Sequence, residues 1–107
     1  MVDYDAIDVE TWNKIKILEQ VKQQAVNREN YEQAQIIKGY MERLRGIGQH
    51  LMQLEEKKQQ ASQVEDYDGA KIIKVEIAKL KKAANNPEME DLIQAFLLEQ
   101  NPNYRAK

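Results

Sequence analysis

The sequence predicts an all-α fold, in which two stacked antiparallel helical hairpins are followed by a C-terminal helix. Three observations predict it: a 36-residue internal repeat, apolar residues at helical spacing within each copy, and the scarcity of glycine (4) and proline (2). The 107 residues lie within the size range of a single domain. Long helices are therefore expected, and a turn-rich sandwich is not.

The repeat is visible when the sequence is aligned with itself. Residues 18–45 align with residues 54–81 without gaps, and 13 of these 28 positions are identical. A period of 36 residues is typical of helix–turn–helix repeats. Within each copy the seam residues step by 3, 4 and 3, as in helices packed nearly antiparallel; in the first copy they are Ile15, Leu18, Lys22 and Ala25, then Ala34, Ile37, Met41 and Leu44. We place the first hairpin at residues 9–47 and the second at residues 48–84.

Polar segments separate the two helices of each hairpin. Asn30 and Asp66 are suited to cap the second helix of their hairpins, and Asp8 is suited to cap the first helix. Gln33 stands three residues after Asn30, as a capping box requires.

A tyrosine follows each turn at a matching position. We expect Tyr31 and Tyr67 to be core residues, packed over Ala25 and Ala61 at the hairpin tips. Trp12 is expected to pack the open end of the first hairpin rather than to anchor a partner.

The two hairpins meet at Gly46-Ile47-Gly48. Two glycines in one turn disfavour a helix, so we expect a break or kink there, and the alternative is one continuous helix. With a break, the fold has five helices.

Residues 1–8 alternate apolar and acidic side chains and are expected to form an extended acidic arm.

A C-terminal helix is predicted over residues 87–101. Asn85-Asn86-Pro87 stops the preceding helix, and Pro87 can open a new one. The apolar face of this helix must be covered, either because it folds back as a cap over the second hairpin or because it enters a partner's groove or a dimer. That face consists of Leu92, Ile93, Phe96 and Leu97.

The residues needed for most catalytic sites are missing or isolated. The chain has no cysteine, one histidine (His50), one serine and one threonine, and its four glycines form no phosphate loop. We therefore expect no enzyme activity, no cofactor and no metal site. A net charge of −2 argues against nucleic acid as a partner. No apolar run approaches the ~20 residues that span a bilayer, and the acidic N-terminus is not a signal peptide, so an intracellular protein is expected.

Ten residues are candidates for binding a protein partner. Ile36 and Ile72 are identical in the two copies but lie about 100° away from the seam, so they widen the core, join the hairpins or hold a partner. Four lysines of the fourth predicted helix share one side and could meet an acidic partner, although a solvated face is the ordinary interpretation; they are Lys71, Lys74, Lys81 and Lys82. The apolar face of the C-terminal helix completes the set.

The turn and seam residues of each copy resemble the UVR motif, a helical hairpin of bacterial excision-repair proteins and Clp-associated adaptors that binds partner proteins. The resemblance is carried by Leu18-Glu19, Ala25, residues 29–34 (ENYEQA), Ile37-Lys38, Met41 and Leu44, and by their counterparts from Leu54 to Leu80. Gly39 and Val75 depart from the pattern, which often has an acidic residue there.

The tandem arrangement is also similar to the coiled-coil region of TOG-domain centrosomal proteins of the ciliary tip. That region has two such hairpins with a glycine-containing join, and an acidic stretch like Val2-Asp3-Tyr4 lies upstream. The resemblance covers residues 2–84 and implies a scaffold segment of a microtubule-associated protein, located at the cilium tip or centriole. The alternative is a UVR-type adaptor of a bacterial protease or excision-repair complex.

Overall fold

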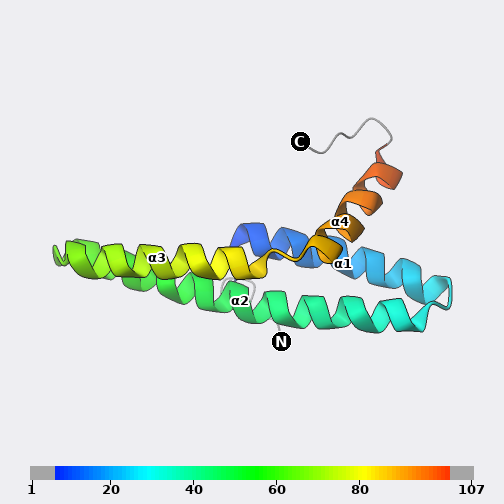
Figure 1. Ribbon diagram of the computed structural model, residues 1–107, viewed down its shortest axis with the longest axis horizontal. Helices are drawn as coiled ribbons and strands as arrows, with labels where there is room; N and C mark the ends of the chain where they lie inside the picture. The colour runs from blue at the N-terminus through cyan, green and yellow to red at the C-terminus, as the bar shows by residue number, and fades with distance from the viewer. Residues whose placement is uncertain (1–6, 102–107) are drawn as a thin grey trace.

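The computed structural model describes residues 7–101, which form four α-helices in an elongated arrangement of 54 × 33 × 19 Å (Figure 1). Helix α1 spans Val9–Asn27, α2 spans Tyr31–Gln63, α3 spans Tyr67–Ala84 and α4 spans Pro87–Gln100. No strand occurs within the described range, so the predicted all-α class is confirmed.

Three of the four helices begin at a predicted cap. Asp8 accepts a hydrogen bond from the Thr11 N–H at 3.2 Å, and Asn30 and Asp66 accept equivalent bonds in α2 and α3. Asn86 caps α4, with Pro87 in the first turn as expected. These side chains satisfy amide groups that a helix start leaves without an intrahelical partner.

The expected break at Gly46–Gly48 is wrong, because α2 runs through it without interruption. The described residues therefore contain four helices instead of five, and the boundary drawn between residues 47 and 48 lies inside α2. One hairpin is formed by α1 with the first half of α2, and the other by the second half of α2 with α3. The two hairpins share a helix and extend in opposite directions along it (Figure 1).

Two features explain the continuity of α2. A repeat of 36 residues is about ten turns of α-helix, so both copies present their apolar residues on the same side of one helix. The buried series accordingly crosses the join, as Met41, Leu44, Gly48, Leu51 and Leu54. Burial of these residues offsets the cost of about 1 kcal/mol for each helical glycine.

Gly48 also has a packing role, because α2 meets the start of α1 at this residue. A Cβ atom on Gly48 would lie 2.6 Å from Ile7 Cγ2 and 3.1 Å from Thr11 Cγ2. A Cβ atom on Gly46 would meet nothing within 4 Å. One glycine of the join is thus required for close approach, and the other is not.

This difference predicts opposite effects of one substitution at two neighbouring sites. Gly46→Ala is expected to raise the free energy of unfolding by about 0.5–1 kcal/mol, since it removes the glycine penalty in an open helical position. Gly48→Ala is expected to lower it by about 1–2 kcal/mol net, because overpacking outweighs the same gain. Chemical denaturation of both variants tests this. Stabilisation by both would show that Ile7 moves aside freely.

The apolar core is divided unequally between the hairpins. The larger cluster contains ten buried residues of the first hairpin, α4 and the segment before α1, with Leu18 and Ile37 at 0% exposure. The smaller cluster of the second hairpin contains Leu51, Leu54 and Ile77. Trp12 packs against the edge of the larger cluster, which confirms its predicted place in the first hairpin.

The first hairpin has the larger cluster because α4 packs on α1. The prediction that this helix caps the second hairpin is therefore wrong: it covers the first. Asn85 and Asn86 have extended backbones that turn the chain after α3, which ends beside the middle of α2 and near α1 (Figure 1). Met89, Ile93 and Phe96 enter the larger cluster there.

The hairpin tips also differ from the prediction. Tyr31 and Tyr67 are 63% and 64% exposed, so they are not core residues. Tyr31 is the first residue of α2, six residues before buried Ile37, which places it about 120° from the seam. The turns are closed by the backbone instead: Glu29 and Glu65 adopt a positive φ, and the N–H groups of Asn30 and Asp66 bond to Ala25 and Ala61 carbonyl oxygens.

Candidate functional site

The predicted partner-binding residues separate into a buried group on α4 and an exposed group on α2 and α3. In α4, Ile93 and Phe96 are 3% and 7% exposed, and Leu92 and Leu97 are partly buried against the same cluster. The face of this helix is therefore covered within the chain. It cannot bind a partner unless α4 leaves α1.

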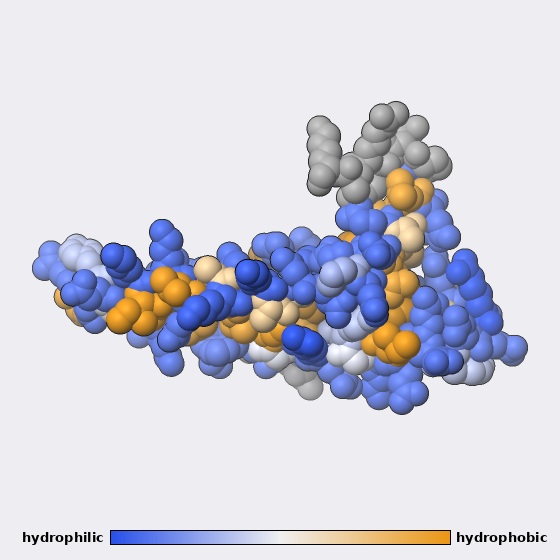
Figure 2. Space-filling model, viewed as in Figure 1, coloured by the Kyte–Doolittle hydropathy of each residue, from blue (hydrophilic) through white to orange (hydrophobic). Residues whose placement is uncertain are grey.

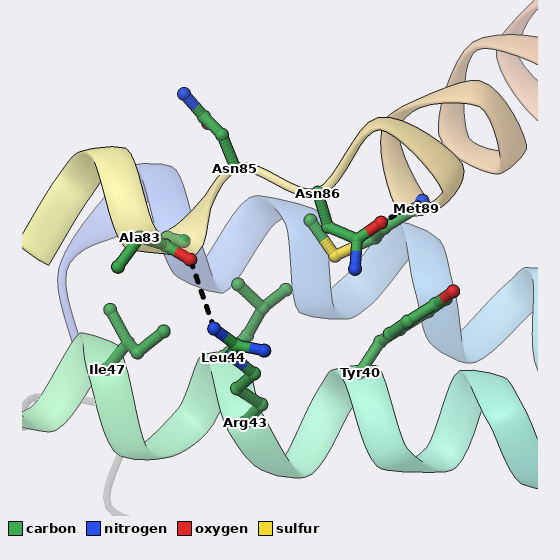
Figure 3. A pocket seen from close by; sticks show the side chains of 9 residues that line it. Tyr40, Arg43, Leu44, Ile47, Ala83, Asn85, Asn86 and Met89 are labelled. Atoms are coloured by element: carbon green, nitrogen blue, oxygen red, sulfur yellow. Dashed lines mark hydrogen bonds between the residues drawn. The ribbon is translucent and has the colours of Figure 1, made fainter.

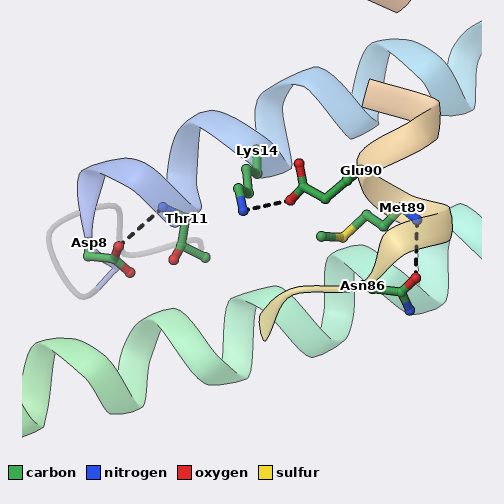
Figure 4. Close-up of polar contacts among 6 residues, drawn as sticks. All are labelled: Asp8, Thr11, Lys14, Asn86, Met89 and Glu90. Carbon is green, nitrogen blue, oxygen red and sulfur yellow. Dashed lines mark hydrogen bonds and ion pairs between the residues drawn. The ribbon is translucent and has the colours of Figure 1, made fainter. Parts of the chain in front are cut away.

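Polar contacts hold α4 in this position. The Lys14 Nζ atom lies 2.7 Å from Glu90 Oε1 and forms an ion pair that links α1 to α4 (Figure 4). The Tyr40 hydroxyl donates to Glu88 Oε2 at 3.2 Å. Near the same junction, Arg43 Nη2 donates to the Ala83 carbonyl oxygen at 3.4 Å (Figure 3). The acidic helix α4 is thus held on the first hairpin by burial of its apolar residues and by polar contacts of its first turn.

Burial raises the pKa of Tyr40 above its ordinary value of 10.0, and the hydrogen bond and negative charge of Glu88 raise it further. A group whose pKa is raised on folding stabilises the fold below its unfolded pKa, and this contribution declines as the pH rises through the folded pKa. The contribution of the Tyr40 hydroxyl is therefore present at neutral pH and declines in alkaline solution, as the pH rises through its raised pKa.

Small clefts border α4. One, of about 190 Å³, lies between the end of α1, the tip of the first hairpin and the outer half of α4. Another, of about 40 Å³, lies where α3 passes into α4 and is lined by Tyr40, Leu44 and Met89 among others (Figure 3). Among residues 7–101, no group of three histidine, aspartate or glutamate side chains is arranged to hold a metal ion.

The exposed group is centred on the two matching isoleucines. Ile36 is 49% exposed and Ile72 is 62% exposed, so neither widens the core nor forms a buried contact between hairpins. Both side chains are therefore accessible at the surface of the molecule.

One side of α3 carries exposed side chains that we call the α3 face: Ile72, Val75, Lys71, Lys79 and Lys82. The acidic residues Asp68 and Glu76 lie one turn before and one turn after Ile72 on this side. Val75 is 50% exposed, and the steps of 3 and 4 residues from Ile72 to Val75 to Lys79 place these three on one side of the helix. Val75 and Lys79 were not among the predicted residues, although this spacing could have identified them. Lys74 and Lys81 are also exposed and lie further round α3.

The fold and this surface define a class: a helical-hairpin protein with exposed apolar and basic side chains along one helix. Within this class, a family model described as the UvrB/uvrC motif (UVR) matches residues 51–83. The chain therefore contains a UVR motif, formed by the second half of α2 and nearly all of α3, and this motif indicates a helical protein-interaction module. No curated protein and no solved structure matches the chain. Within the described part of the chain, no helix is long and apolar enough to cross a membrane.

Proposed function

We propose that this chain is a non-catalytic protein-interaction and scaffold module with two UVR-like hairpins. The observation that carries the proposal is the UVR match to the second hairpin, whose α3 exposes apolar side chains beside lysines. The first hairpin carries the aligned residues of the first copy, which supports the same kind of module there, and α4 covers it. Helices that expose an apolar stripe commonly bind a partner through it.

The cellular setting forms a finer part of the proposal. The tandem hairpins with a glycine-containing join favour a segment of a ciliary-tip or centrosomal microtubule-associated protein, because they resemble the coiled-coil region of such TOG-domain proteins. The description of the matching family favours the second candidate, an adaptor of a bacterial protease or excision-repair complex. A TOG array in the flanking coding sequence would support the first, and an ATPase or nuclease domain would support the second.

Proximity labelling with the full chain in ciliated cells tests the function directly. We expect enrichment of cytoskeletal proteins over a matched control that carries Ile36→Ser and Ile72→Ser, which removes both exposed isoleucines without touching the core. No labelling above background would contradict an interaction role in this setting, whereas identical labelling by the two proteins would show that the partner binds elsewhere than at the two isoleucines. Native mass spectrometry of the purified chain provides the test of non-catalytic function, because a bound metal or nucleotide would contradict it.

A further inference from the structure

The α3 face distinguishes the second hairpin from the first. Figure 2 shows an apolar patch over α3, at the end of the molecule away from α4. In the first copy, glutamine and glycines stand where the face has Lys71, Val75 and Lys82: these are Gln35, Gly39 and Gly46. Of the five positions of the α3 face, only two keep an apolar or basic residue in the first copy: Ile36 aligns with Ile72, and Arg43 aligns with Lys79. The apolar and basic surface therefore belongs to the second hairpin alone.

The second hairpin also has less cover than the first. Helix α1 packs on both α2 and α4, whereas α3 packs along α2 and has a single buried residue, Ile77. Ile73 and Leu80 remain partly exposed at the edge of the smaller cluster. A further helix laid beside α3 would bury Ile72 and Val75, as α4 buries the larger cluster.

The charge of α3 indicates which charged side chains a helix beside it would carry. Helix α3 contains five lysines and two acidic residues, Asp68 and Glu76. Among residues 7–101, no ion pair includes a lysine of α3. Lys71, Lys79 and Lys82 border the apolar side chains, so carboxylates at the edges of an apolar stripe would meet unpaired ammonium groups.

The chain itself contains a helix of this type bound to the other hairpin. Helix α4 has four acidic residues and no basic one, and Glu90 pairs with Lys14 at 2.7 Å. Met89, Ile93 and Phe96 of this helix are already buried against the first hairpin, at 2%, 3% and 7% exposure, so α4 of a second copy is not free to cover α3. Pairing with α3 of a second copy would place lysines against lysines. We therefore take the occupant to be a helix from another protein.

From this geometry we propose that the α3 face binds an acidic amphipathic helix of a partner protein. Apolar residues at steps of 3 and 4 in the partner pack on Ile72 and Val75, and flanking glutamate or aspartate residues pair with Lys71, Lys79 and Lys82. The inference rests on the proposed interaction function and specifies its surface and the chemistry of its partner.

Titration of the isotopically labelled full chain with synthetic helical peptides, followed by NMR, tests the surface. The probe is a Leu/Glu peptide with leucines at helical spacing, and the controls are the same composition scrambled and the same pattern with lysine for glutamate. We expect amide shifts concentrated in α3, and binding about tenfold weaker or worse for both controls.

Variants identify the residues. Ile72→Ser combined with Lys79→Glu is expected to abolish the α3 shifts, whereas Ile36→Ser, at the matching position of the first copy, leaves them unchanged. Circular dichroism checks that each variant keeps its helices. Shifts confined to α1 and α4, or equal binding of the scrambled peptide, would overturn the proposal, because the first places the site elsewhere and the second shows simple charge attraction. A dimer in light scattering that Ile72→Ser dissociates would also overturn it, since a second copy would then occupy the face.

These results are distinguishable from failure of the proposed function. A partner that is still labelled in cells by the Ile72→Ser, Lys79→Glu chain leaves the interaction module intact and overturns only the α3 face. Peptide binding to α3 without any cellular partner would contradict the function and retain the surface property.

Discussion

Replacement of Leu18 by alanine is expected to lower the free energy of unfolding by about 3–5 kcal/mol, the range for a leucine whose cavity cannot collapse. Leu18 is fully buried and belongs to the cluster that joins α1, the first half of α2 and α4. Because residues of three helices make up this cluster, we expect that a shift of one helix cannot fill the space that the missing side-chain atoms leave.

Leu54 provides the matched control, because it is the same residue type at the same place in the second copy. It is 6% exposed and belongs to a two-helix cluster of three buried residues. Leu54→Ala is therefore expected to cost only about 2 kcal/mol. Urea denaturation of both variants, with the slope compared to detect loss of two-state behaviour, gives the two values. Equal costs would show that α4 adds nothing to the packing of Leu18.

Replacement of Phe96 by alanine is expected to cost about 3–5 kcal/mol. Its ring is 7% exposed and lies in the larger cluster, although it belongs to a helix of 14 residues that is attached by a short linker. The loss should also loosen α4, because the ring is one of three α4 residues buried in that cluster. Thermal unfolding should show a lower midpoint, and a dye that binds apolar surface should respond more strongly.

Leu98→Ala is the control for this helix. Leu98 is 46% exposed, so its removal should change the free energy of unfolding by no more than about 0.5 kcal/mol. Equal effects at positions 96 and 98 would mean that α4 is not docked on α1 in solution.

Local rules were enough to predict where the first three helices begin. A cap depends on one side chain and the amides within three residues of it, so Asp8, Asn30 and Asp66 could be assigned from the sequence. The seams depend only on helical spacing, and Leu18, Ile37 and Leu44 are buried as predicted. Because the two copies have similar sequences, the repeat predicts that both form the same helical hairpin.

The candidate site was predicted in part. Ile72 and Lys71 were identified because they repeat or cluster, but Val75 was missed because it has no counterpart in the first copy, where Gly39 stands. The apolar face of α4 was read correctly as a face that needs cover. Its partner could not be derived, because a stripe of leucine, isoleucine and phenylalanine fits any apolar groove of suitable width.

Three features were decided by the tertiary structure. The glycine join is helical because burial along both hairpins outweighs a local penalty and because Gly48 lies against Ile7 and Thr11. Tyr31 and Tyr67 are exposed because their position in the first turn of each helix directs them away from the seam. Helix α4 lies on the first hairpin because the extended Asn85 and Asn86 direct it toward α1, where Lys14 and Tyr40 receive its carboxylates. Capping and periodicity act over one or two turns and can be read along the chain, whereas these outcomes depend on contacts between residues up to 76 positions apart, which only the folded arrangement of the helices defines.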